Sequence, residues 1–128
     1  MTKKGKTIIL SIKPEFANKI FEGTKKYEFR RSIFKQPDVN TVIVYVTNPT
    51  QKIIGEFKIE RVLCLAPREL WKKTKKYSGI TKDSFFEYFI NKDLGYALKI
   101  KNTRKYKKPL CIRKDFNSIP PQSFRYVA

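Results

Sequence analysis

The chain has 128 residues, the usual size of one domain, and this length can bury a hydrophobic core without disulfide or metal staples. Lysine and arginine number 29 against 11 aspartates and glutamates, so the formal net charge is +18, with no histidine. Apolar residues make up 41% of the chain and aromatic residues 14%, which excludes an intrinsically disordered chain and predicts one domain over residues 1–128.

Strands in the first half of the chain are predicted at residues 7–12, 26–30, 41–46 and 52–65, from β-branched runs and alternating polarity. Pro14 suits the first turn of a helix that follows the first strand, and Gly23 suits its C-cap. Asn48-Pro49 predicts a turn after the third strand. Gly55 predicts a bulge or a close backbone approach within the fourth strand.

Elements in the second half are predicted as helices at 67–77 and after the N-cap Thr81, and as extended pieces from Gly95 onward, at 109–112 and at 123–127. The basic run at 99–108 predicts a hairpin with its tip at Asn102-Thr103. The order β-α-β-β-β-α-α-β-β lacks regular βαβ alternation. We therefore predict an α+β fold, with a mixed or mostly antiparallel sheet that closes into a small barrel flanked by short helices.

The charge makes a polyanion the natural partner, because Coulomb steering and counterion release attract phosphate backbones. A merely solvated, lysine-rich surface is the alternative. The apolar run Ile8–Leu10 is too short for a signal peptide or a membrane span, so we expect a cytoplasmic protein that binds no membrane. Cys64 and Cys111 lie far apart in apolar surroundings, which favours buried free thiols and argues against a metal site. No cofactor is expected.

One segment carries chemistry: residues 23–30, GTKKYEFR, read as G-x-K-x-x-E-x-R directly after a helix. As a strand, this segment places Tyr27 and Phe29 on one face and Lys26, Glu28 and Arg30 on the other. Three charges cannot be buried without polar partners, so the charged face is expected to meet solvent or a ligand.

The G-x-K-x-x-E-x-R segment resembles the signature of ASCH domains. The resemblance extends over nearly the whole chain, through ILSIKP at 9–14, YVTNP at 45–49, IGEF at 54–57 and PPQSFRY at 120–126. It implies a PUA-like pseudo-barrel and a basic cleft lined by the signature. It also implies that the partner is RNA or single-stranded DNA.

Nucleic-acid contacts are expected from Lys13, Lys25, Lys26, Glu28, Arg30, Arg31, Thr47, Arg125 and Tyr126. Arg30 can offer its planar fork to a phosphate or a guanine edge, while Lys25 and Lys13 act as point charges on phosphate oxygens. Glu28 repels phosphate, so it would orient Arg30 or accept hydrogen bonds from an exocyclic amine of a base. Tyr126 is a candidate for stacking on an unpaired base.

Each role has a structural alternative. Glu28 and Arg30 could form only an intrastrand pair, and Lys25 and Lys26 could be ordinary surface lysines. The other stacking candidates are Tyr27, Tyr45 and Phe124, for which packing in the core is the preferred interpretation.

The resemblance also brings hydrolase functions, since some small ASCH proteins are amidohydrolases of acetylated cytidine and others are proposed ribonucleases. In the amidohydrolases the motif lysine activates a threonine three residues downstream. Lys25 matches that lysine, but Glu28 stands at the position of the threonine, and nothing places Thr24 or Thr47 beside Lys25. Binding is therefore preferred to catalysis, and a catalytic protein would use Lys25 and Glu28 on RNA or a modified nucleoside. A regulatory module that binds another protein is a third possibility.

Overall fold

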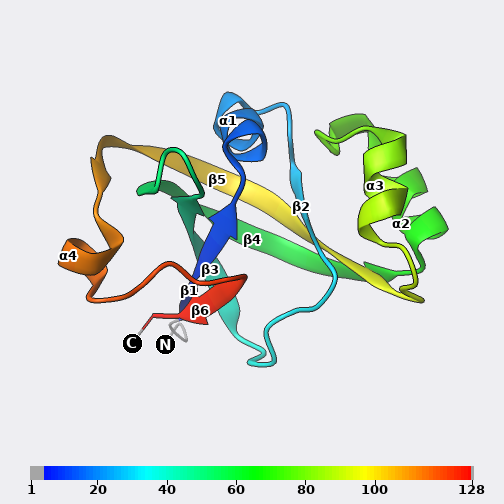
Figure 1. Cartoon of the computed structure of the whole chain (residues 1–128). Coiled ribbons are helices and arrows are strands. Elements are labelled where there is room, and N and C mark those ends of the chain that lie inside the picture. The colour runs from blue at the N-terminus through cyan, green and yellow to red at the C-terminus, as the bar shows by residue number, and fades with distance from the viewer. Residues whose placement is uncertain (1–4, 128) are drawn as a thin grey trace.

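The computed structural model describes residues 5–127, so the ends of the expected domain, residues 1–4 and 128, lie outside the described part. Its elements are β1 (Lys6–Ile12), α1 (Pro14–Glu22), β2 (Tyr27–Arg30), β3 (Val39–Val46), β4 (Lys52–Leu65), α2 (Pro67–Thr74), a 3-10 turn (Lys75–Tyr77), α3 (Lys82–Tyr88), β5 (Gly95–Leu110), α4 (Ile112–Phe116) and β6 (Phe124–Tyr126). In the described range these strands form one six-stranded sheet in the order β2-β5-β4-β3-β1-β6 (Figure 1).

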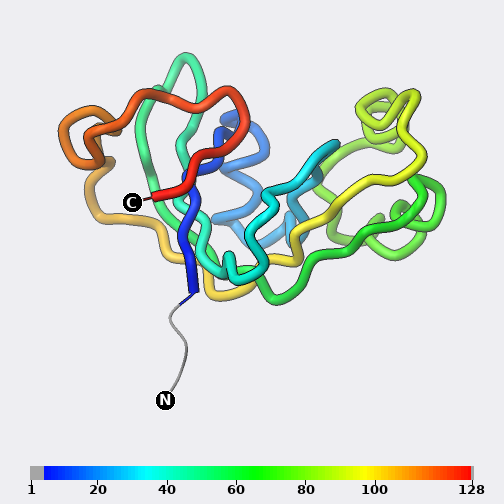
Figure 2. The backbone as a smooth tube through the Cα atoms, turned by 90° about the horizontal axis from the view of Figure 1, so that it is seen from below, coloured from blue at the N-terminus to red at the C-terminus, as the bar shows by residue number. Residues whose placement is uncertain are grey.

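The sheet is mixed and curled into a half-barrel. β1 pairs with β3 in parallel, and the other strand pairs of the described chain are antiparallel. Helix α1 lies over the middle of the sheet, α2 and α3 lie together beside one end, and α4 lies beside the other (Figures 1 and 2). The predicted α+β fold with a mixed sheet and short helices is confirmed.

Apolar clusters on both sides of the sheet hold these elements together. The largest joins β1, β3, β4 and α1, and its fully buried members include Ile20, Val42 and Phe57. Another packs α2 and α3 onto β2 and β5, with the rings of Phe29 and Phe85 edge-to-face at 5.0 Å between centroids. Each fully buried side chain of this size stabilises the fold by about 1.5–3 kcal/mol. The apolar face of β2 therefore lies in the core, which leaves its charged face for the opposite side.

Helix caps and a strand irregularity lie at the residues where the sequence predicts them. Gly23 closes α1 with a φ of 91°, a conformation that favours glycine. Thr81 caps α3, because its hydroxyl oxygen accepts a hydrogen bond from the backbone nitrogen of Ser84 at 3.2 Å. Gly55 lies at a shift in the β4–β5 register, and a Cβ there would stand 2.6 Å from the carbonyl oxygen of Arg104. Both predicted reasons for this glycine therefore apply.

The predicted basic hairpin at 99–108 is wrong. These residues belong to the single strand β5, which pairs with the 14-residue strand β4. Asn102 has a positive φ of 52°, but it lies among register shifts within the β4–β5 ladder, and the chain does not reverse its direction there. The reason is the length of β4, since its backbone supplies partners for the run without a turn. The predicted end of the extended piece at 109–112 is also wrong, because Ile112 is the first residue of helix α4, which the sequence did not predict.

The cysteines differ from the buried thiols that their apolar neighbours predict. Cys64 is exposed and Cys111 is half-buried. The C-terminal part of β4 extends beyond the main core, so residues 60, 61, 62 and 64 are all exposed. Strand position, and not the polarity of the neighbouring residues, therefore decides the exposure of Cys64.

Candidate functional site

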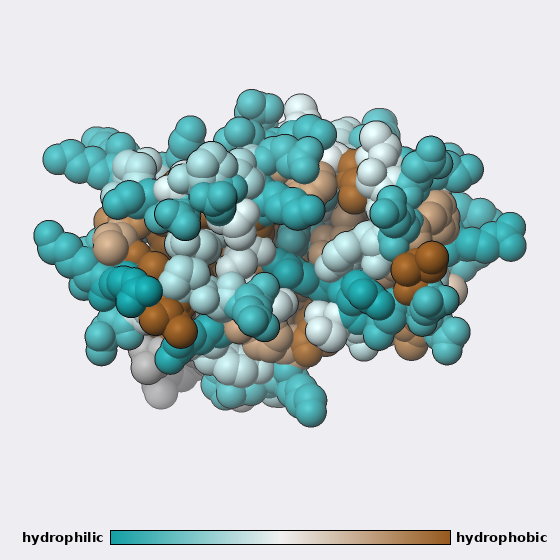
Figure 3. Space-filling model, viewed as in Figure 1, coloured by the Kyte–Doolittle hydropathy of each residue, from teal (hydrophilic) through white to brown (hydrophobic). Residues whose placement is uncertain are grey.

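The charged face of β2 borders a pocket formed with the end of β1, α1 and α3. Its volume is about 160 Å³, and its walls are Ser11, Ile12, Lys13, Phe16, Lys25, Glu28, Phe29, Arg30, Ile80 and Tyr88. The front of the molecule is hollowed near its centre, between hydrophilic side chains (Figure 3). We call this pocket the motif pocket, because Lys25, Glu28 and Arg30 of the G-x-K-x-x-E-x-R segment line it.

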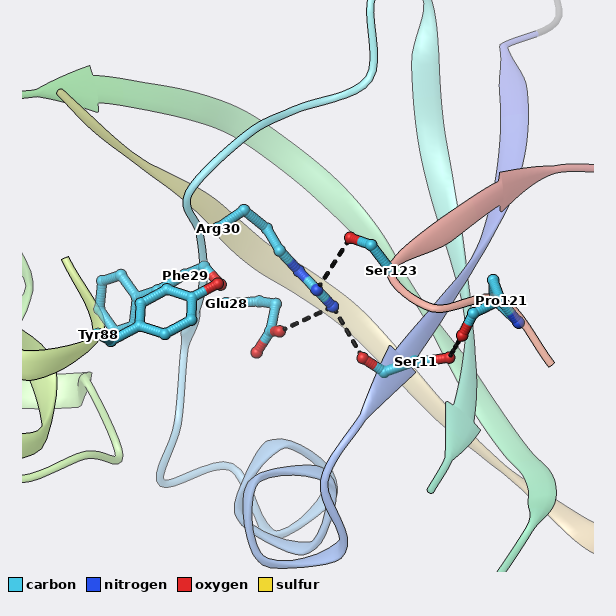
Figure 4. A network of polar contacts seen from close by, with 7 residues as sticks. All are labelled: Ser11, Glu28, Phe29, Arg30, Tyr88, Pro121 and Ser123. Carbon is cyan, nitrogen blue, oxygen red and sulfur yellow. Dashed lines mark hydrogen bonds and ion pairs between the residues drawn. The ribbon is translucent and has the colours of Figure 1, made fainter. Parts of the chain in front are cut away.

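Arg30 is the centre of a polar network in the motif pocket (Figure 4). Its Nη2 donates to the carbonyl oxygen of Ser11 at 2.8 Å and lies 3.3 Å from Glu28 Oε2, while Nη1 is 3.4 Å from the hydroxyl oxygen of Ser123. The side chains of Arg30 and Glu28 are only 14% and 9% exposed. Within residues 5–127, Arg30 Nε is buried without a hydrogen-bond partner. The guanidinium thus ties β2 to β1 and to the segment before β6 while one donor stays unused.

Lys25 is buried although it carries an amine. The residue is 2% exposed, and its Nζ donates to the carbonyl oxygen of Ser78 at 2.6 Å. Nζ also lies 4.7 Å from the centre of the Phe29 ring and 5.1 Å from that of Phe16. Burial lowers the pKa of Lys25 to about 8, although the charge of Glu28 opposes this shift. About a tenth of the amine is therefore neutral at pH 7.

The loop between the 3-10 turn and α3 holds Lys25 in place. Besides Ser78, this loop contacts α1 through the carbonyl oxygen of Gly79, which accepts from Lys19 Nζ at 3.2 Å. Tyr77, the last residue of the 3-10 turn, accepts a hydrogen bond at its carbonyl oxygen from the backbone nitrogen of Lys26 at 2.8 Å. Gly79 has a φ of 65°, and a Cβ there would stand 2.7 Å from Cβ and Cγ of Lys25. Gly79 therefore shapes the site although it lies outside the signature.

Substituting Gly79→Ala is expected to cost more stability than Gly23→Ala. Both glycines have positive φ, which costs an alanine about 1 kcal/mol, but no atom of residues 5–127 lies within 4 Å of a Cβ at Gly23. At Gly79 the clash with Lys25 adds a further cost, so we expect about 2–3 kcal/mol in total. Urea denaturation of both variants measures the difference, and equal losses would show that Lys25 does not depend on this glycine.

The predicted contact residues separate into two groups. Lys13, Lys25, Glu28 and Arg30 line the motif pocket. Lys26 instead is exposed beside it, with Nζ 4.4 Å from the centre of the Tyr77 ring. It lines another hollow that also contains Lys25, Asn102 and Thr103, so the predicted tip of the basic run lies next to the signature.

The remaining predicted residues lie away from the motif pocket. Arg31 is exposed just beyond the end of β2, and Arg125 is exposed on β6. Thr47 is in the turn after β3, where its backbone nitrogen donates to the carbonyl oxygen of Ile12 at 3.0 Å. The hydroxyl oxygen of Tyr126 accepts hydrogen bonds from the backbone nitrogens of Lys35 and Gln36, at 3.1 and 3.2 Å, which fixes the loop after β2.

The structure adds site residues that sequence reasoning missed, namely Ser11, Ile80, Tyr88 and Ser123. Tyr88 is 37% exposed, and its hydroxyl donates to the carbonyl oxygen of Phe29 at 3.3 Å. Burial raises the pKa of Tyr88, so the hydroxyl keeps its proton at neutral pH. Helical spacing offered no signal for it, since Tyr88 follows Phe85 by three residues and reads as part of the same apolar face.

The part of the chain that the structure describes contains no group of three or more His, Cys, Asp or Glu residues suited to a metal ion. In the same range, every helix is too short or too polar to cross a lipid bilayer.

Comparisons with known proteins identify the family and the fold of the chain. The family model of the ASCH domain matches residues 10–111. The large ribosomal subunit protein uL22 of Ureaplasma parvum is 33% identical over 124 residues, which are 94% of this chain but only 39% of that protein. The chain therefore spans about two fifths of the length of this relative. An ASCH domain-containing ribonuclease of Zymomonas mobilis is 26% identical over 95% of this chain and 84% of its own.

Solved structures share the fold. The crystal structure of ASCH from Zymomonas mobilis superposes with a TM-score of 0.86 at 24% identity, over 95% of this chain and 87% of the other. The N-terminal domain of McrB from Staphylothermus marinus gives a TM-score of 0.56 at 15% identity, over 93% and 85% of the two chains. At these identities the likeness establishes the arrangement of strands and helices.

Proposed function

Because this chain belongs to the ASCH domain family, we propose that it binds RNA or another single-stranded nucleic acid in a basic cleft whose deepest part is the motif pocket. One unpaired base enters the pocket, and the flanking phosphates contact cations at its rim. A nucleic-acid-related function is supported by the family and by the relative named as a ribonuclease, which aligns with 95% of the chain.

The proposal rests on the size of the motif pocket and on the residues that line it. Its volume of about 160 Å³ is close to the roughly 150 Å³ cavity that accepts one benzene ring in another protein. Phe16, Phe29 and Ile80 supply apolar walls for a planar ring. A base inside a duplex is stacked and paired, so it would have to leave the helix to reach such a pocket. The fit therefore favours single strands.

The polar groups of the pocket suit a base better than a phosphate. The Glu28 carboxylate repels phosphate but can accept hydrogen bonds from an exocyclic amine. Arg30 beside it also lines the pocket and can donate to a base carbonyl or ring nitrogen. Such bonds are strong in a water-poor pocket. The phosphates are left to exposed cations such as Lys13, and the net charge of +18 makes that contribution salt-dependent.

Replacing Tyr88 by alanine is expected to weaken single-strand binding by about 5- to 150-fold, because the ring borders the pocket where a base would stack. Val62→Ala is the control, since Val62 is an exposed apolar side chain on β4, 40% exposed, and lies outside the pocket. Fluorescence titration of labelled single strands, a mononucleotide and a duplex measures both variants. Equal effects of the two substitutions on single strands would contradict a base site at the motif pocket.

RNA cleavage is a second candidate, favoured by the buried amine of Lys25 with a pKa of about 8. As a neutral base, Lys25 would take the proton of a ribose 2′-hydroxyl, whose oxygen attacks phosphorus. The bond to the 5′-oxygen breaks, and that oxygen takes the proton back from the lysine, which then returns to its neutral form.

The hydrogen bond of Lys25 weighs against this chemistry, because in the described chain its partner is the carbonyl oxygen of Ser78 and not a hydroxyl or a carboxylate. Incubation of single-stranded RNA with the protein and a metal chelator decides the matter. Cleavage that disappears in Lys25→Met would establish catalysis, and intact RNA would leave binding as the function.

A further inference from the structure

A second hollow adjoins the motif pocket and has no part in the base site. It lies between the loop after β2 and the turn that leads from α3 into β5, and its volume is about 670 Å³. We call it the Arg31–Tyr96 groove, after two of the residues that line it. Its cations are Arg31, Lys35 and Lys92, and its carboxylate is Asp93. The groove is therefore basic and large enough for more than one ring.

Chain connectivity and strand pairing place the groove beside the motif pocket. Arg30 lines the pocket, and the next residue, Arg31, lines the groove. Arg30 is also the register partner of Tyr96 in the β2–β5 ladder. At the end of α3, Tyr88 of the pocket precedes Asn91 of the groove by about one turn. A strand that leaves the pocket past Tyr88 and β2 would therefore meet the groove next.

The groove has the chemistry that a nucleotide outside a base pocket requires. Exposed Arg31 and Lys35 can contact phosphate oxygens. Half-buried Tyr96 offers an aromatic ring, and Leu94 is 49% exposed beside it, which gives an unpaired base an apolar surface. Stacking of a base on such a ring contributes about 1–3 kcal/mol. Asp93 is the opposing group, because its carboxylate repels phosphate.

We propose that the Arg31–Tyr96 groove binds the nucleotide adjacent to the one whose base occupies the motif pocket. The protein then holds two neighbouring nucleotides of a single strand, with their bases in separate sites. This inference rests on the proposed function, since it needs a strand anchored at the motif pocket. A duplex cannot satisfy it, because its neighbouring bases stay stacked on each other.

A gain of affinity is the first test, because misfolding cannot produce it. Asp93→Asn removes the carboxylate from the groove, so an oligonucleotide about ten nucleotides long should bind about 3-fold more tightly at low salt. Binding of a mononucleotide, which the motif pocket accommodates alone, should not change. The control is Asp83→Asn, which makes the same charge change at an exposed position in the first turn of α3. An equal gain with Asp83→Asn would overturn the inference.

A loss of stacking is the second test. Tyr96→Leu should weaken binding of the oligonucleotide by about 5- to 50-fold while the mononucleotide binds as before, and Tyr96→Phe should stay within about 2-fold of the original protein. An unchanged oligonucleotide affinity in Tyr96→Leu would overturn the inference. The Tyr88→Ala variant separates the two proposals. If Tyr88→Ala weakens the binding of both the oligonucleotide and the mononucleotide, while Tyr96→Leu and Asp93→Asn change neither affinity, the proposal for the groove is wrong and that for the motif pocket holds. If Tyr88→Ala changes neither affinity, the proposal for the motif pocket is itself wrong.

Discussion

Replacing Arg30 by alanine is expected to lower the affinity for single strands by about 30- to 150-fold, which corresponds to the loss of about 2–3 kcal/mol from charge-assisted hydrogen bonds. The free energy of unfolding should fall by about 3 kcal/mol as well. This second loss follows because the carboxylate of Glu28, 9% exposed, loses the guanidinium 3.3 Å away, and the carbonyl oxygen of Ser11 loses its donor.

Two variants separate recognition from charge and from misfolding. Arg30→Lys keeps the net charge but cannot span Glu28, Ser11 and a ligand with a planar fork, so it should bind single strands nearly as weakly as Arg30→Ala. Arg61→Ala removes an arginine at an exposed position on β4, outside the pocket. Titrations with circular dichroism as a check on folding measure all three. If Arg30→Lys binds single strands as tightly as the original protein, the positive charge of residue 30 alone accounts for its contribution to binding.

Replacing Lys25 by methionine is expected to stabilise the protein at pH 7 while it damages the site. The pKa of Lys25 falls from 10.5 to about 8 on folding, so the buried ammonium costs about 3 kcal/mol at neutral pH. Methionine removes that cost but leaves the Ser78 carbonyl oxygen without its donor, which costs about 1–2 kcal/mol. The net gain should be about 1–2 kcal/mol. A destabilising residue kept at a ligand site is a common trade between stability and function.

The pH dependence identifies the cause. Between pH 8 and 10.5 the unfolded chain holds the Lys25 proton while the folded chain releases it, so the original protein gains about 1.4 kcal/mol of stability per pH unit relative to Lys25→Met. The advantage of the variant should therefore shrink above pH 8 and reverse near pH 9. Urea denaturation of both proteins from pH 7 to 10.5 measures the gap. A gap that does not change with pH would contradict a buried charge.

The sequence predicts most of the fold because its local signals are strong. The N-cap Thr81, the C-cap Gly23 and the strand at 52–65 coincide with the ends of the observed elements. The basic run in β5 misled for a physical reason, since a strand that pairs along an exposed ladder can consist of charged residues and still be continuous. A sequence reveals polarity, but the length of the pairing strand β4 decides whether the chain turns.

The site is predicted less completely, because it combines segments far apart in the chain. The alternation in β2 predicts that Glu28 and Arg30 share a face, and the resemblance to ASCH domains points to the same residues. The contacts of Lys25 with Ser78 and of Arg30 with Ser123 join positions 53 and 93 residues apart. No periodicity encodes such contacts. Tyr88 was missed because exposure at the end of a helix depends on what the neighbouring loop leaves uncovered.

The most direct measurement is a titration of single-stranded RNA, single-stranded DNA and duplex at several salt concentrations, with the original protein and with Arg30→Ala. If the motif pocket holds an unpaired base, the two proteins should give nearly parallel salt dependences, offset by about 30- to 150-fold for single strands and nearly coincident for the duplex. If both proteins bind every ligand alike and release it with added salt, the charge of +18 accounts for binding and the pocket serves another ligand.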